Sequence, residues 1–190
     1  MKKLILTLAI VATAFGLQAQ EFPKVDGSPM DASYYPERAA KRLFAETEAE
    51  IKANEPKIRV VYSRPQKKGR DVFGELLKYG EMWRIGANEA TEILFYQDVT
   101  VGNTKIEAGR YTMYALVNES SWDIHFSTDQ DTWGHYRFDP AKTSVAKITV
   151  PTKKTSSTVE NLSIMFQNGE TGADMIIGWD DTMVSVPIGL

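Results

Sequence analysis

The sequence predicts a mainly β protein: an antiparallel β-sandwich or a partly closed barrel, with one N-terminal amphipathic helix. The first observation behind this prediction is a period-two alternation of apolar and polar residues in several short segments. In one of them, Trp122, Ile124 and Phe126 alternate with Asp123 and His125. This period is typical of a half-buried antiparallel strand, because successive side chains of a strand point to opposite faces.

The second observation is the turn-forming residues that separate these segments, such as Gly102-Asn103, Asn168-Gly169 and Asp180-Asp181. Many short strands joined by tight turns favour a sandwich or a barrel. We expect strands at residues 58–63, 91–97, 110–117, 121–126, 133–138, 145–150, 161–167, 173–179 and 182–188.

The N-terminus has the pattern of a secretory signal peptide. Lys2 and Lys3 precede an uncharged apolar run over residues 4–17, and the small Ala19 follows. An uncleaved anchor is the alternative, but the run is shorter than the about 20 residues that a membrane-spanning helix needs. We therefore expect residues 1–19 to be a signal peptide. The mature protein is expected to be periplasmic or secreted and to have no membrane span after cleavage.

The mature chain is expected to consist of two parts. Residues 20–57 predict an extended lead-in followed by a single amphipathic helix over 36–54, because apolar residues recur there at helical spacing and Pro36 suits a first helical turn. Residues 58–190 predict the β-domain.

Composition excludes some functions. Without Lys2 and Lys3 the chain has 20 basic and 25 acidic residues, and this acidic balance argues against nucleic acid as a partner. The chain has no cysteine, and therefore no thiol nucleophile, thiolate metal site or disulfide. The expected partners are a small polar ligand or a protein of the cell envelope.

Residues 62–92 differ from an ordinary connection, because aromatic side chains alternate there with glycines and three arginines. Arginine offers a planar fork of donors that suits carboxylate or phosphate, and tryptophan offers a flat face for a sugar ring or a base. We predict a binding site for a polar or anionic small ligand, with a saccharide as one such ligand. Its candidate residues are Arg64, Arg70, Trp83, Arg84, Asn88 and Glu89.

The same arginines have a structural interpretation. Arg70 and Arg84 could pair with Glu89 or Glu92 and order the loop without a ligand, since ion-pair networks often resemble functional clusters. The chain would then be a structural or protein-interaction component of the cell envelope. A binding site predicts converging, incompletely paired arginines, whereas a structural network predicts full pairing.

A hydrolase is the third hypothesis, and whether the chain is an enzyme stays open. The sequence contains no nucleophile elbow, zinc-protease motif, P-loop or dinucleotide fingerprint, and it predicts no cofactor and no metal. Paired carboxylates are still conceivable, with Asp71, Glu81 and Glu89 as candidates. A hairpin about Gln130 would also place His125 opposite His135, but two ligands are too few for a metal site.

Several long motifs resemble the DUF2911 family. They are YSRP at 62–65, KGRDVFGE at 68–75, YGEMWRIGANEAT at 79–91, AGRYTMYA at 108–115, W-x-I-x-F at 122–126 and WDDTMVSVPI at 179–188. The resemblance extends over residues 22–188 and implies an exported bacterial protein, largely of Bacteroidetes type. The family's function is unknown, so the resemblance implies no activity and no catalytic residues.

Overall fold

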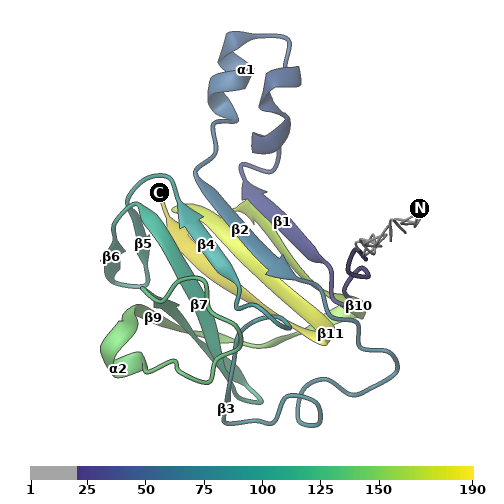
Figure 1. The fold of residues 1–190 in the computed structure, drawn as a ribbon. Helices are drawn as coiled ribbons and strands as arrows, with labels where there is room; N and C mark the ends of the chain where they lie inside the picture. Colours follow the sequence, from purple (N-terminus) through teal and green to yellow (C-terminus); the bar gives the residue numbers. More distant parts are fainter. Residues whose placement is uncertain (1–20) are drawn as a thin grey trace, which may run out of the picture.

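The computed structural model describes residues 21–190, and the expected signal peptide lies outside this range. Two antiparallel sheets pack face to face in a sandwich that does not close into a barrel, as Figure 1 shows. The mainly β fold class expected from the sequence is therefore confirmed. Within the described residues, no helix is long and apolar enough to cross a membrane.

The first sheet has the strand order β1-β2-β4-β7-β8-β9. A short additional strand, β3, pairs with the end of β7 that β4 leaves free, because Trp83 lies opposite Ala115 while Glu92 lies opposite Thr112. The chain between β3 and β4 is thus free to leave the sheet. The bounds are β1 Met30–Tyr35, β2 Ile58–Ser63, β3 Glu81–Trp83, β4 Glu92–Phe95, β7 Gly109–Val117, β8 Ser121–Ser127 and β9 Ser144–Pro151.

The second sheet has the order β10-β11-β5-β6 and covers the inner face of the first. Its edges approach those of the first sheet, because β1 contacts β10 and β9 contacts β6. The core between the sheets contains the apolar residues of both inner faces, including the fully buried Trp122, Ile124 and Phe126 of β8. The bounds are β5 Val99–Val101, β6 Thr104–Ile106, β10 Lys153–Asn168 and β11 Gly172–Gly189.

The turn expected at Asp180-Asp181 does not form, because both residues lie inside the long strand β11. In its first half the buried side chains have odd numbers up to Trp179, and in its second half they have even numbers from Thr182 onward. The change of phase falls at Asp180, whose φ is 56°, where the pairing with β10 shifts register. One extra residue there keeps both halves facing the core, as a β-bulge does.

Two short helices replace the single helix expected over residues 36–54. The 3₁₀-helix η1 covers Ala39–Phe44 and the α-helix α1 covers Glu48–Ala53. Thr47 and Glu50 form a capping box, which starts a new helix at this point. Both helices lie beyond the end of the sandwich, between β1 and β2 (Figure 1). The side chains of Leu43 and Phe44 are 74% and 84% exposed, so the expected apolar stripe does not pack on the β-domain.

Residues 133–138 do not form the expected strand. β8 pairs with β7 and β9, and the chain between β8 and β9 contains only the short helix α2, Pro140–Thr143, capped by Asp139. Gly134 has a φ of 79°, and its amide donates to the carbonyl of Asn88. This segment is therefore bound to the loop between β3 and β4.

Candidate functional site

A cavity of about 410 Å³ lies where the loop after β2, strand β3 and the segment around His135 meet. We call it the Arg84 cavity. Its apolar side includes Leu77, Met82, Trp83 and Trp179. The charged and titratable side chains that line it are Arg70, Lys78, Glu81, Arg84 and His135.

The chain leaves the sheet directly after Trp83, and a tight set of contacts fixes Arg84 there. Ile85 adopts a φ of 53°, and its carbonyl accepts a hydrogen bond of 2.6 Å from the hydroxyl of Thr91. The indole of Trp83 donates to the carbonyl of Gly86 at 3.1 Å. A Cβ at Gly86 would lie 2.8 Å from the Ser63 hydroxyl, so any other residue here would force the Ser63 side chain to move.

The guanidinium of Arg84 is incompletely paired. Its Nε is buried and has no hydrogen-bond partner, and Arg84 forms no ion pair within residues 21–190. Its Cζ lies 6.0 Å from the centre of the Trp133 ring, a cation–π distance. Arg84 is therefore held in place by an aromatic ring while part of its donor capacity stays unused.

His135 is the second unpaired group of the Arg84 cavity. Its Nδ1 is buried without a partner, as the Nε of Arg84 is. Burial lowers the pKa of His135, the positive charge of Arg84 lowers it further, and Glu81 acts in the opposite direction. The imidazole is thus neutral near pH 7 and can donate or accept one hydrogen bond.

The Arg84 cavity has an excess of positive charge. Arg70, Lys78 and Arg84 face one carboxylate, Glu81, among the lining residues. Lys78 is exposed and pairs with Glu75 at 3.4 Å, which weakens its field but does not remove it. A group of positively charged side chains of this kind favours carboxylate or phosphate ligands.

Three of the six residues predicted for the site, Arg70, Trp83 and Arg84, do line the Arg84 cavity, and three do not. Arg64 donates to the carbonyl of Leu162, to Asp31 at 2.9 Å and to the hydroxyl of Ser163. It therefore ties the end of β2 to β1 and β10, and each of its three side-chain nitrogens already donates to another part of the protein.

Asn88 and Glu89 contribute through their backbones. The carbonyl of Asn88 accepts from Gly134, and Glu89 forms a bridge with Trp133, so both hold the segment that carries His135. Sequence reasoning named His135 only as a partner of His125 and did not place it in this site, because its segment meets the loop of residues 84–91 through long-range backbone bonds.

Trp83 offers no open face for a sugar ring. It is 2% exposed, stacks on Trp179 at 6.0 Å and contacts the edge of Trp122 at 5.7 Å. Trp83 lies opposite the buried Ala115 of β7, on the inner face of the sheet. Trp83 therefore forms a wall of the Arg84 cavity and part of the core.

The expected ion pairs of Arg70 and Arg84 with Glu89 or Glu92 do not form. Glu92 pairs with Arg110 at 3.3 Å, across the β4–β7 ladder. Arg70 is exposed and donates to the backbone carbonyls of Gln66 and Lys67, so it fastens the loop that it belongs to. Full pairing of the arginines, which a purely structural network predicts, holds for Arg64 and fails for Arg84.

The predicted hairpin that would place His125 opposite His135 does not form. His125 lies opposite Tyr114 on β7 and Lys147 on β9, and its Nδ1 lies 3.1 Å from the hydroxyl of Ser144. In the part of the chain that the structure describes, no group of three or more His, Asp or Glu side chains is arranged to hold a metal ion.

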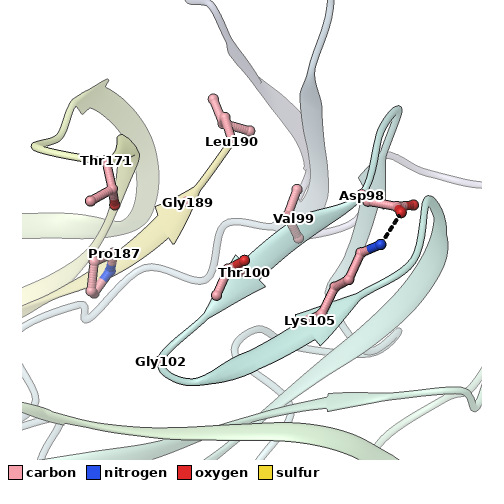
Figure 2. Close-up of a pocket in the computed structure, with 9 residues that line it drawn as sticks. All are labelled: Asp98, Val99, Thr100, Gly102, Lys105, Thr171, Pro187, Gly189 and Leu190. Carbon is pink, nitrogen blue, oxygen red and sulfur yellow. Dashed lines mark ion pairs between the residues drawn. The ribbon is translucent and has the colours of Figure 1, made fainter.

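A larger cavity of about 610 Å³ lies between the β5–β6 hairpin and the end of β11, as Figure 2 shows. Its two charged side chains, Asp98 and Lys105, pair with each other at 2.7 Å. None of the buried, unpaired side-chain atoms found in residues 21–190 belongs to its lining. The Arg84 cavity is therefore the stronger candidate.

Comparison with known proteins identifies one family. The family model described as "Protein of unknown function (DUF2911)" matches residues 45–188, which include both sheets apart from β1. No curated protein and no solved structure matches the chain.

Proposed function

The chain belongs to the DUF2911 family, and we propose that it binds a small anionic ligand, a carboxylate or a phosphate compound, in the Arg84 cavity. The observation that carries this proposal is a pair of buried nitrogens without hydrogen-bond partners, Nε of Arg84 and Nδ1 of His135, in one cavity. Leaving a buried donor unsatisfied costs about 1–3 kcal/mol. A ligand oxygen that reached one of these nitrogens would remove this cost.

The charges of the Arg84 cavity support an anion in particular. Arginine binds carboxylates and phosphates through two parallel N–H bonds, and a neutral histidine adds one more donor or acceptor. Arg70 and Lys78, both exposed at the rim, would attract an anion toward Arg84. The apolar wall of Trp83, Met82 and Trp179 lowers the local dielectric constant, which strengthens these interactions.

The hydrolase alternative has less support. General acid–base cleavage of a glycosidic bond uses two carboxyl groups flanking one bond. Glu81 is the one carboxylate among the residues that line the Arg84 cavity, and Asp71 and Glu89 lie outside its lining. The N-terminal signal peptide expected from the sequence would place the binding protein in the periplasm or outside the cell.

Isothermal titration calorimetry on residues 20–190 tests this proposal, with inorganic phosphate and acetate as probes. We expect Arg84→Gln to weaken phosphate binding by about tenfold or more, because it removes a charge and a two-pronged donor. Arg84→Lys keeps the charge and should recover only part of the affinity, since lysine lacks the planar fork.

Arg38→Gln is the matched control. Arg38 is an exposed arginine next to η1, outside the Arg84 cavity, and the same chemical change there should leave phosphate affinity unchanged. Absence of phosphate and acetate binding in the wild type, or equal losses in Arg84→Gln and Arg38→Gln, would contradict the proposal.

A further inference from the structure

A second cavity, of about 400 Å³, adjoins the Arg84 cavity and has a different character. We call it the Trp133 cavity. Aromatic side chains line much of it, with a carboxylate and a guanidinium beside them: Tyr114, Asp129, Trp133, Tyr136, Arg137 and Phe138. An aromatic lining with a few polar groups is the usual composition of a small-molecule site.

The two cavities share a boundary. His135 lines both of them, and the Arg84 guanidinium of the first lies over the Trp133 ring of the second. The rings of His135 and Tyr136 also stack, with centroids 5.2 Å apart. A ligand of two or more chemical groups could therefore contact the charged side chains with one end and the aromatic rings with the other.

The exposed aromatic rings of the Trp133 cavity lie on a fixed backbone. Trp133 and Tyr136 are 62% and 73% exposed and stack on each other at 6.1 Å. Their segment is bound by the amide of Gly134 to Asn88, and by the amide of Ala90 to Thr132.

The floor of the Trp133 cavity is equally well anchored. Phe138 stacks on Tyr114 at 4.1 Å, and the hydroxyl of Tyr114 lies 3.0 Å from that of Thr132. Aromatic side chains that lie next to one another and are exposed, as Trp133 and Tyr136 are, are typical of binding surfaces.

We propose that the ligand is an anionic sugar, whose pyranose ring packs on Trp133 and Tyr136 while its carboxylate or phosphate group binds Arg84 and His135. This inference rests on the proposed function and adds the ligand class. A pyranose ring has an apolar face of C–H groups, which suits an aromatic ring, and an edge of hydroxyl groups, which needs donors and acceptors.

The polar side chains of the Trp133 cavity fit that edge. Asp129 uses its Oδ2 to accept from Thr143, and Arg137 forms no ion pair within residues 21–190. One side chain can accept from a sugar hydroxyl and the other can donate to one. Sequence reasoning placed the aromatic surface at Trp83, but the exposed rings are those of Trp133 and Tyr136.

The test is a calorimetric comparison of glucuronate, glucose 6-phosphate, glucose, acetate, inorganic phosphate and adenosine monophosphate on residues 20–190. We expect each anionic sugar to bind about tenfold or more tightly than its bare anion. Trp133→Ala and Tyr136→Ala should reduce that ratio of affinities to about twofold or less. The ratio is the readout because Trp133 contacts Arg84 and Tyr136 stacks on His135, so either substitution also changes the affinity for the bare anion. Tyr136→Ala is included because Tyr136, unlike Trp133, does not support Arg84.

Tyr96→Ala is the control, since Tyr96 is a partly exposed aromatic residue that lines neither cavity. Phosphate binding that requires Arg84, with no advantage for either anionic sugar, would overturn this inference and leave the proposed function standing. Preference for adenosine monophosphate over both sugars would also overturn it. If the wild type binds neither the bare anions nor the anionic sugars, the proposed function itself is contradicted.

Discussion

The Nζ of Lys67 lies 2.6 Å from Oδ1 of Asp180, and this ion pair joins the loop after β2 to the bulge of β11. The other carboxylate oxygen of Asp180 accepts from the buried amide of Val72 at 3.1 Å. The bulge therefore does more than keep β11 in phase with the core. It places one carboxylate where it fastens two points of the loop that forms a wall of the Arg84 cavity.

Substitutions of Asp180 should separate the contribution of its ion pair with Lys67 from that of its hydrogen bond with the Val72 amide. Asp180→Ala leaves the buried Val72 amide without an acceptor, which costs about 1–3 kcal/mol of unfolding free energy, and it also places alanine at a φ of 56°. Asp180→Asn retains an acceptor oxygen and tolerates this φ, so its loss should be smaller. Urea denaturation measures both, and equal losses would show that the Val72 contact is unimportant.

Trp122 tests the placement of the core. Its side chain is fully buried and contacts the rings of Phe73 and Trp83 at 5.1 and 5.7 Å. We expect Trp122→Ala to lower the free energy of unfolding by about 3–5 kcal/mol. Trp133→Ala, at an exposed position, should change it by no more than about 0.5 kcal/mol. Chemical denaturation compares the two, and an unchanged midpoint for Trp122→Ala would disprove the packing described.

Arg64 tests the distinction between a structural arginine and Arg84, the arginine proposed to bind a ligand. Its contacts to Asp31, Leu162 and Ser163 join three strands, so Arg64→Gln should lower the melting temperature. Because Arg64 does not line the Arg84 cavity, phosphate affinity should stay within about twofold of the wild type. A calorimetric loss of affinity as large as that of Arg84→Gln would place Arg64 in the site after all.

The stability of the fold should decrease as the pH falls below the ordinary histidine pKa of 6.5. Burial lowers the pKa of His125, Lys147 lowers it further, and Asp123 opposes this. The unfolded state then binds a proton more readily than the folded state, so stability is fully present above pH 6.5 and is lost as the pH falls toward the folded-state pKa. Urea denaturation at about pH 7.5 and 5.5 should show a smaller loss for His125→Gln than for the wild type.

Local pattern predicted the strands whose inner face is fully apolar. Residues 58–63 form β2 as expected, because β-branched and aromatic residues alternate there without interruption. Residues 133–138 were also predicted to form a strand, and this prediction is wrong. Gly134 bends the chain there, and long-range hydrogen bonds to Asn88 and Ala90 replace a ladder. The periodicity of a segment indicates which of its residues can face a core. It does not indicate which other segment of the chain they pack against.

The lining of the Arg84 cavity was predicted only in part for the same reason. Residue type identified Arg70 and Arg84, since an arginine among aromatic residues and glycines is chemically conspicuous. Residue type could not show that Arg64 donates to Leu162, nor that Trp83 is covered by Trp179, because these contacts join segments about a hundred residues apart. The backbone bonds of Asn88 and Glu89 hold the segment of His135 beside the loop, and no local pattern in the sequence indicates them.

The most direct measurement of the central claim is a nuclear magnetic resonance titration of the two histidines of the chain, with and without inorganic phosphate. The pKa of His135 is lowered by burial and by Arg84. A bound anion would offset the charge of Arg84, so the pKa of His135 should rise when phosphate is added. His125, which lies outside the lining of the Arg84 cavity, serves as the internal control and should not change. If phosphate leaves His135 unchanged, or shifts both histidines equally, then no anion occupies the Arg84 cavity and the account is contradicted.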